Sequence, residues 1–305
     1  MNTSIDINGL TKSFAAVTAV NGLTLAVQEG EMFGLIGADG AGKTTTMRIL
    51  CGLLHPDQGQ VRLLGYDVQR DLRQIRRLIG YMPQRFSLYP DLTVAENLRF
   101  FSDLFQVTAL EREQRLRRLL EFSRLGPFAD RPAQALSGGM KQKLALSCTL
   151  IHTPRLLLLD EPTTGVDPVS RREFWDILRE LRAEGVTILV STPYMDEADS
   201  CDRVAFMHKG KILTVKKPAE IPSLYQAKLL EIRCRHHLQA GQRLSATGRF
   251  DSVQIFGDRI HAAATADPAV MRAWVEEALP EDKANLQIKV IPAGIEDVFV
   301  ALLKE

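Results

Sequence analysis

Apolar and polar positions alternate at residues 5–7 and again at residues 23–27, which is the period of half-buried β-strands. A compact apolar run follows at residues 32–36. It stops at Gly37, and the glycine-rich segment after it leads into a helical pattern over residues 45–54. The pattern therefore predicts a leading antiparallel β portion, followed by a strand, a loop and a helix.

Residues 92–150 follow a helical period instead. Apolar residues recur there at spacings of three and four, most clearly over residues 94–104 and 116–122. We therefore expect an inserted helical subdomain at about residues 85–150.

Continuous apolar runs return at residues 156–159 and 186–190, as is typical of parallel strands that are covered on both faces. A helical pattern at residues 171–184 separates them. Residues 204–207 and 212–215, on either side of a lysine-flanked glycine, predict a hairpin. These elements predict an α/β fold whose core closes after the helical insertion.

The pattern changes after Pro218, with a boundary within residues 216–226. The remainder holds strand candidates at residues 229–234, 253–256, 259–262 and 286–290, and helix candidates at residues 268–279 and 295–303. We expect two domains, residues 1–220 and residues 221–305, of which the second is a small α+β appendage.

Composition excludes several classes of protein. The chain has 305 residues, 45% of them hydrophobic, and its formal net charge of +1 supplies no net field for nucleic acid or anionic lipid. The apolar runs are far shorter than the ~20 residues of a membrane-spanning helix. Residues 1–14 carry no secretion signal, and the four cysteines are scattered, as in a reduced cytosolic chain.

The glycine-rich segment reads Gly37-Ala38-Asp39-Gly40-Ala41-Gly42-Lys43-Thr44 and satisfies G-x-x-x-x-G-K-[ST] between a strand and a helix. Glycines let backbone N–H groups point at phosphate oxygens, and the helix adds the positive end of its dipole. Lys43 is predicted to bridge the β- and γ-phosphates, and the Thr44 hydroxyl to ligate Mg²⁺. The segment predicts a nucleoside triphosphate site.

A second element supplies carboxylates, because Asp160 and Glu161 directly follow the apolar run at residues 156–159. Acids in that position cost heavily to bury without a cation. Adjacent residues of a strand point to opposite sides, so we expect Asp160 to hold Mg²⁺ and Glu161 to act as general base toward water.

Ser137-Gly138-Gly139 opens a long helical pattern and forms another anion cradle, which suggests that two chains share each ATP. With this motif in place, about residues 3–217 resemble the ATP-binding-cassette (ABC) family. The family signature LSGGQ matches residues 136–140, except that Met140 replaces glutamine.

The resemblance implies an α/β fold built on a P-loop NTPase core, that is, an ABC nucleotide-binding domain. It further implies an ATPase with ATP and Mg²⁺ as cofactors, at the cytoplasmic face of the membrane. The expected partners are an exporter-type permease of the ABC-2 class and a second cassette, on another chain or fused in tandem, and no nucleic acid. The motifs and the resemblance together assign nucleotide contact to Phe14, Gly37, Ala38, Asp39, Gly40, Ala41, Gly42, Lys43, Thr44, Thr45, Ser137, Gly138 and Gly139, metal contact to Thr44, Gln84 and Asp160, and catalysis to Glu161 and Gln84.

Further matches follow from the same resemblance. Gln84 matches the Q-loop glutamine, which reports to the membrane partner, and residues 164–167 match the D-loop at the dimer interface. Residues 86–89 with 92–98 are similar to the groove that receives a permease. Residues 194–198 and 295–299 are similar to the exporter-type branch of the family.

Position 193 departs from the family, which places a switch histidine there to contact the γ-phosphate. Pro193 has neither a side-chain donor nor a backbone N–H, and it favours an extended Thr192. Two interpretations stay open, a tolerated substitution or a site that binds ATP and hydrolyses it slowly. Ala38 and Asp39 are milder departures.

Two other functions remain as alternatives. One is a soluble cassette ATPase that acts on ribosomes or nucleic acid, although such proteins usually carry two cassettes with a charged linker, or a long coiled-coil insertion, and the chain shows neither. The other is an ATP-sensing regulatory cassette with vestigial catalysis, for which Pro193 is the sole support.

Overall fold

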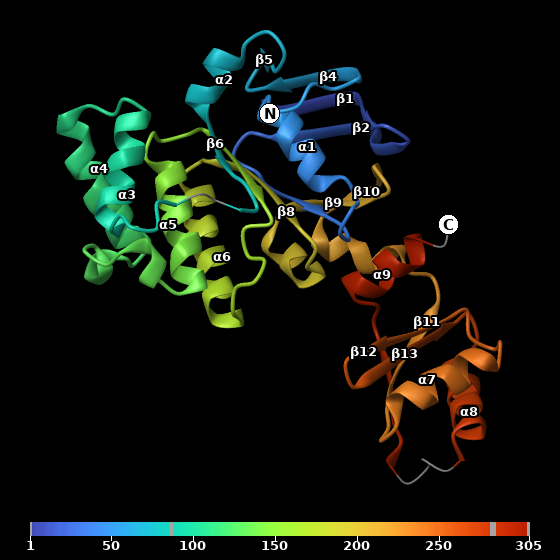
Figure 1. Ribbon diagram of the computed structural model, residues 1–305. Helices are drawn as coiled ribbons and strands as arrows, with labels where there is room; N and C mark the ends of the chain where they lie inside the picture. Colours follow the sequence, from blue (N-terminus) through green and yellow to red (C-terminus); the bar gives the residue numbers. More distant parts are fainter. Residues whose placement is uncertain (1, 86–87, 281–284, 304–305) are drawn as a thin grey trace. The chain divides into compact units, whose positions relative to one another are not determined.

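The computed structural model describes residues 2–85, 88–280 and 285–303 (Figure 1). The chain divides into two compact units, Met1–Pro218 and Ala219–Glu305. Each unit has a hydrophobic core of its own.

The first unit contains an antiparallel sheet and a larger, mainly parallel one. The antiparallel sheet has the order β2-β1-β4-β5, with β1 (Thr3–Phe14), β2 (Val17–Gln28), β4 (Gln58–Leu63) and β5 (Tyr66–Asp67). The larger sheet has the order β10-β9-β3-β8-β7-β6, with β3 (Met32–Ile36), β6 (Ile79–Met82), β7 (Leu156–Asp160), β8 (Thr187–Thr192), β9 (Arg203–His208) and β10 (Lys211–Lys216). All neighbours in it are parallel except β9 and β10, which form the expected hairpin.

Helices of the first unit follow the expected order. They are α1 (Lys43–Leu50), α2 (Leu72–Leu78), α3 (Val94–Leu104), α4 (Ala109–Phe122), α5 (Gly138–Leu150) and α6 (Pro168–Ala183), with short 3₁₀ turns at Gly126–Phe128, Ala133–Ala135 and Met195–Ser200. The central α5 packs against α3, α6 and β6. Helix α3 has the predicted bounds, set at its start by a capping box between Thr93 and Glu96.

The helix expected at residues 45–54 is displaced, since α1 begins at Lys43 and ends at Leu50. Gly52 adopts a left-handed φ of 65°, which breaks the helix before the apolar pair that follows. Helix α6 starts three residues earlier than expected because Asp167 caps it and Pro168 occupies its first position.

The second unit has the order β11 (Lys228–Arg233), α7 (His237–Ala246), β12 (Ser252–Phe256), β13 (Arg259–Ala264), α8 (Pro268–Ala278), β14 (Gln287–Ile291) and α9 (Ile295–Leu302), after a 3₁₀ turn at Pro218–Leu224. Its antiparallel sheet, β12-β13-β11-β14, with helices in this order is a split βαβ arrangement. Helices α7 and α8 pack Leu244 and Met271 against Leu230 and Ile260 of the sheet. Helix α7 was not predicted from the sequence.

Over residues 2–85, 88–280 and 285–303, no helix combines the length and the apolar character needed to cross a membrane.

Candidate functional site

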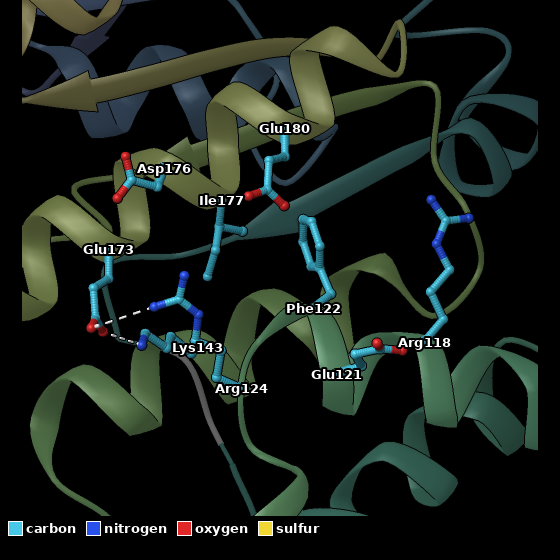
Figure 2. Close-up of a pocket in the computed structure, with 9 residues that line it drawn as sticks. All are labelled: Arg118, Glu121, Phe122, Arg124, Lys143, Glu173, Asp176, Ile177 and Glu180. Atoms are coloured by element: carbon cyan, nitrogen blue, oxygen red, sulfur yellow. Dashed lines mark hydrogen bonds and ion pairs between the residues drawn. The ribbon is translucent and has the colours of Figure 1, made fainter.

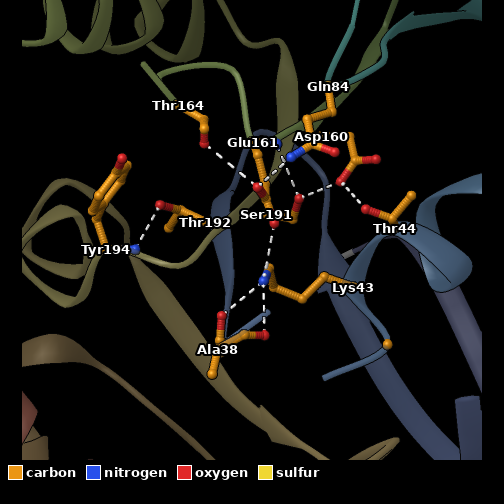
Figure 3. Close-up of polar contacts among 12 residues, drawn as sticks. Ala38, Lys43, Thr44, Gln84, Asp160, Glu161, Thr164, Ser191, Thr192 and Tyr194 are labelled. Atoms are coloured by element: carbon orange, nitrogen blue, oxygen red, sulfur yellow. Dashed lines mark hydrogen bonds and ion pairs between the residues drawn. The ribbon is translucent and has the colours of Figure 1, made fainter. Parts of the chain in front are cut away.

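The ends of three neighbouring strands bring the predicted polar residues together (Figure 3). Strands β3, β8 and β7 are parallel neighbours, so their carboxyl ends meet at one edge of the sheet, as in other open α/β sheets. In this register Asp160 pairs with Ser191, and Ile36 pairs with Thr192. The segment at residues 37–42 leaves β3 at this edge and enters α1.

Backbone geometry explains the glycines of this segment. Gly42 has a φ of 109°, and a Cβ placed there would lie 2.2 Å from the carbonyl oxygen of Ala19. A Cβ at Gly37 would lie equally close to the carbonyl oxygen of Met207. The loop can therefore follow this path only with glycine at these two positions.

The Lys43 side chain is buried beneath the loop. Its Nζ donates to the carbonyl oxygens of Gly37 (2.7 Å) and Ala38 (3.1 Å), and lies 3.0 Å from Glu161 Oε1. Lys43 is also the first residue of α1, where the helix presents its positive end. The cation is thus held at the point where an anion would bind.

The Asp160 carboxylate has two unequal oxygens. Oδ1 accepts hydrogen bonds from Ser191 Oγ (2.7 Å) and Thr44 Oγ1 (3.1 Å). Burial raises the pKa of Asp160 above its ordinary value, although these two hydrogen bonds oppose the shift. Oδ2 is buried and accepts no hydrogen bond from the described part of the chain. An orphaned carboxylate oxygen beside a threonine hydroxyl is the hard oxygen donor set that Mg²⁺ prefers, so these residues fit that ion.

Glu161 follows β7 with a left-handed φ of 49°. The alternation of side chains along the strand therefore ends at Asp160. It does not by itself place the two acids on opposite sides, as was expected. Glu161 Oε2 accepts from Gln84 Nε2 (2.9 Å) and from Thr164 Oγ1 (3.4 Å). Its backbone N–H faces Ser191, with distances of 3.1 Å to both the carbonyl oxygen and Oγ. The carboxylate is therefore held against Lys43 on one side and Gln84 on the other.

A cleft of about 340 Å³ opens over these groups. It is lined by residues 39–45 together with Ala19, Gln84 and Glu161. Gln84 also lines a second cleft of about 410 Å³, with Arg85, Leu88 and Lys141 among its neighbours.

Other predicted residues lie outside the lining of the first cleft. Phe14 ends β1, and its side chain is 46% exposed. Ser137 caps α5 by accepting from the backbone of Met140 (3.3 Å), and Ser137 and Gly138 are exposed. Gly139 is buried against α6, where an added Cβ would lie 2.4 Å from Ser170 Cβ. The predicted groove includes residues 86 and 87, which are outside the described residues.

Pro193 follows β8 in a segment that a buried carboxylate fixes. Glu197 is 3% exposed and accepts hydrogen bonds from Thr163 Oγ1 (2.7 Å) and Thr192 Oγ1 (2.5 Å). Arg171 lies 3.7 Å from the same carboxylate, and its guanidinium stacks on Tyr194 at 4.0 Å. Thr192 ends β8 in the extended conformation expected before proline.

Sequence reasoning missed Ser191 and Glu197 as parts of this site. Ser191 enters it only through the pairing of β7 with β8, and a single sequence does not reveal that register. The position of Ser191 at the end of an apolar run, on the edge where the acids were expected, was the available signal.

Another cavity, of about 350 Å³, lies between α4, α5 and α6 (Figure 2). Figure 2 shows Phe122 of α4 pointing toward Ile177 and Glu180 of α6. Lys143 bonds to Glu173, and Arg124 lies 3.9 Å from the same carboxylate. Charges of both signs neutralise each other here, so this cavity has no clear preference for a charged ligand.

The parallel sheet, the glycine loop entering α1 and the two acids after β7 define the class as a P-loop NTPase fold. A family model described as "ABC transporter" matches residues 20–164. The chain is 39% identical to the Nod factor export ATP-binding protein I of Burkholderia lata, over 98% of this chain and 96% of that protein. The chain therefore belongs to the ABC transporter family, as an ATP-binding cassette.

Other similarities are consistent with this assignment. The chain is 51% identical to the probable multidrug ABC transporter ATP-binding protein YbhF of Escherichia coli, over 98% of this chain and 52% of that protein. It thus spans about half the length of that relative. Among solved structures, an ATP-binding subunit of an ABC transporter is 31% identical with a TM-score of 0.65, covering 72% of this chain and 92% of that chain. The dimeric ATP-binding cassette MJ0796 with ADP and Pi is 27% identical with a TM-score of 0.64, covering 70% of this chain and 98% of that chain.

Proposed function

We propose that the chain binds ATP with Mg²⁺ and hydrolyses it to drive export through a membrane permease. The observation that carries this proposal is the convergence of Lys43, Thr44, Gln84 and Glu161 on one cleft, with Asp160 hydrogen-bonded to Thr44. The names of the relatives from Burkholderia lata and Escherichia coli, which refer to Nod factor export and multidrug transport, support the export direction. Residues 1–220 would carry the ATPase, and residues 221–305 the appendage.

The glycine loop and Lys43 bind the phosphates. Backbone N–H groups of the loop and the start of α1 provide donors, and the ammonium group of Lys43 provides the charge. When bound, Mg²⁺ would neutralise charge on the β- and γ-phosphates. Thr44, Asp160 and Gln84 would hold it, and the orphaned Oδ2 of Asp160 is the acceptor that fits this role.

Glu161 accepts the proton of the attacking water in this proposal. Its carboxylate pairs with Lys43 and accepts a hydrogen bond from Gln84. Phosphate oxygens compete for the ammonium group of Lys43, so nucleotide binding releases Glu161 toward the water. Gln84 then remains within hydrogen-bond reach of Glu161 and helps to orient the same water.

A second cassette would complete the ATP site. Ser137 and Gly138 are exposed at the N-terminal end of the 13-residue helix α5, which suits an anion held by another copy or by a tandem cassette. Phe14 offers an exposed ring for stacking on adenine. The solved cassette MJ0796 is dimeric, which supports the same arrangement here.

An ABC-2 type permease is the proposed membrane partner. Gln84 lines both the nucleotide cleft and the neighbouring 410 Å³ cleft, so a change at the γ-phosphate has a direct route to that surface. Beside it the rings of Tyr89 and Phe100 meet at a tilt of 59°, with their centroids 4.4 Å apart, and the two residues are 44% and 36% exposed. An exposed aromatic pair next to a polar cleft suits a docked protein segment.

We further propose that Pro193 slows hydrolysis. It offers no hydrogen-bond donor to a γ-phosphate, and its segment is fixed by Glu197. Glu161 and Gln84 remain in contact, so hydrolysis is attenuated rather than lost. A competent partner cassette would then carry most of the turnover.

The test is ATPase activity of the purified chain, in steady state and in a single turnover. Glu161→Gln is expected to abolish phosphate release, and Pro193→His to raise turnover about tenfold, which corresponds to about 1.4 kcal/mol of barrier. Single-turnover phosphate release separates a transport ATPase from an ATP sensor, which would bind ATP without releasing phosphate. If Pro193→His leaves turnover unchanged while Glu161→Gln abolishes it, the proline is a tolerated substitution.

A further inference from the structure

Ser191 is the side chain that joins the two acids of the site. It is fully buried near the end of β8, and its backbone pairs with Asp160 of β7. Its hydroxyl donates to Asp160 Oδ1 (2.7 Å) and accepts from the backbone N–H of Glu161 (3.1 Å). One hydroxyl group therefore donates a hydrogen bond to the carboxylate of Asp160 and accepts one from the backbone of Glu161.

The donation to Asp160 decides which carboxylate oxygen is free. Both donors to this carboxylate, Ser191 and Thr44, approach Oδ1, while Oδ2 is buried and accepts no hydrogen bond from residues 2–85, 88–280 or 285–303. The donor with the shorter contact comes from the fully buried Ser191, whereas Thr44 is partly exposed. Ser191 thus fixes the orientation of the Asp160 carboxylate.

The acceptance from Glu161 supports a strained backbone. Glu161 has a φ of 49°, which is unfavourable for a residue with a Cβ and persists only where neighbours hold it. Its N–H points at Ser191, between the carbonyl oxygen and Oγ. This conformation turns the Glu161 side chain toward Lys43 and Gln84 (Figure 3).

We propose that Ser191 is a positioning residue that keeps Asp160 Oδ2 available to Mg²⁺ and holds Glu161 in its left-handed conformation. The proposal rests on the proposed ATPase function and assigns Ser191 a part in it. Without the hydroxyl, the carboxylate of Asp160 can rotate and lose the orientation in which Oδ2 meets the ion.

A matched control lies near the other end of the same strand. Ser4 Oγ bonds to Thr187 Oγ1 of β8 (3.1 Å), and Ser4 is 2% exposed. Ser4→Ala therefore removes a buried hydroxyl contact to β8 without touching the acids. Ser191→Ala and Ser191→Cys both remove the strong donor, and the cysteine keeps the volume filled.

The experiment uses the full chain with a non-hydrolysable ATP analogue. Electron paramagnetic resonance measures Mn²⁺ binding in the nucleotide complex, and fluorescent-nucleotide titration in EDTA measures metal-free binding. We expect both Ser191 variants to weaken Mn²⁺ binding about tenfold and to change metal-free binding less than twofold. Ser4→Ala is expected to leave both affinities as in the wild type.

Two results would overturn the inference. In the first, both Ser191 variants bind Mn²⁺ within twofold of the wild type. In the second, Ser4→Ala weakens Mn²⁺ binding as much as they do, which would show a general effect of β8 stability. If the wild type binds no nucleotide at all, the proposed ATPase function itself fails, and this outcome is distinct from both.

Discussion

Lys43 Nζ lies 3.0 Å from Glu161 Oε1, and the two side chains are 3% and 7% exposed. The charge that the proposed mechanism needs for phosphate and the charge that it needs for water thus neutralise each other in this structure. A buried ion pair is costly unless further hydrogen bonds support it. Lys43 has two carbonyl acceptors and Glu161 has the Gln84 amide, so this pair is well supported. ATP must therefore compete with Glu161 for the lysine.

Glu161→Gln is expected to tighten ATP binding as well as to stop hydrolysis. A neutral amide holds the ammonium group of Lys43 less strongly than a carboxylate does. The phosphates of ATP therefore have a weaker interaction to displace. The expected gain in affinity is about tenfold, or about 1.4 kcal/mol. Isothermal titration calorimetry measures this affinity directly, at a protein concentration too low for the chain to dimerise.

A control for this prediction comes from the opposite end of β3. Glu31 is 8% exposed, precedes β3 and pairs with Arg203 (2.6 Å). Glu31→Gln removes a carboxylate from another ion pair and is expected to leave ATP affinity unchanged. Equal affinities for Glu161→Gln and the wild type would contradict the idea of competition.

The raised pKa of Asp160 gives a pH dependence with a definite sign. Between the unfolded value of 3.8 and the raised value, the folded chain binds more protons than the unfolded chain. Stability contributed by this group is therefore lost as pH rises through the folded pKa and is regained as pH falls. Asp160→Asn is expected to resist urea better than the wild type at pH 7.5, with a difference that shrinks as the pH falls through the folded pKa of Asp160.

Mg²⁺ and ATP should reverse the order of stability of the wild type and Asp160→Asn. The ionised carboxylate gains a cation when they bind, so the wild type is expected to gain more stability than Asp160→Asn. Urea titrations with and without Mg²⁺-ATP measure the difference. A variant less stable than the wild type at pH 7.5 without ligand would refute the assigned cost of burying this charge.

Much of the fold was predictable because it follows strong local periodicity. The runs at residues 156–159 and 94–104 gave a buried strand and an amphipathic helix directly. Strand β4 has polar residues and glycine at its start and is exposed there, so its pattern is weak. Helix α7 was missed for a similar reason, since Gly241 and polar residues interrupt its apolar face.

Site residues were predictable only where they are contiguous in the sequence. The glycine loop with Lys43 is contiguous, and so are Asp160 and Glu161. The contacts of Ser191 with the acids depend on the register of two strands that are 31 residues apart in sequence at this pair. The Lys43 to Glu161 pair likewise joins distant segments, and no motif encodes it.

Glu197 is expected to be a stability determinant of the segment that contains Pro193. Its buried carboxylate accepts hydrogen bonds from Thr163 and Thr192, so Glu197→Ala leaves two hydroxyl groups without their acceptor. It also removes the negative charge that lies 3.7 Å from Arg171. The expected loss is about 3 kcal/mol, and Glu197→Gln should lose about 1 kcal/mol. Urea unfolding followed through buried Trp175 of α6, in a Trp274→Phe background, reports on the first unit.

The exposed pair of Arg118 and Glu184 provides a comparison, because Glu184→Gln removes an acid that water screens. Its effect on unfolding should be small. If Glu197→Ala unfolds at the same urea concentration as Glu184→Gln, the buried network does not support the segment.

Gly139 should tolerate no side chain while Ser170 faces it. A Cβ at Gly139 would lie 2.4 Å from both Cβ and Oγ of Ser170, and the next neighbour, Val166 Cγ1, is 3.6 Å away. Gly139→Ala is therefore expected to push the turn at Ser137-Gly138-Gly139 away from α6. The expected loss in free energy of unfolding is about 1 to 3 kcal/mol, and ATP-dependent dimerisation should weaken. Adding Ser170→Gly removes the clashing atoms and should restore dimerisation, measured by analytical ultracentrifugation with Mg²⁺-ATP in the Glu161→Gln background. Failure of the double variant to dimerise, with its fold intact by circular dichroism, would mean that the methyl group blocks the partner's nucleotide rather than the contact with α6.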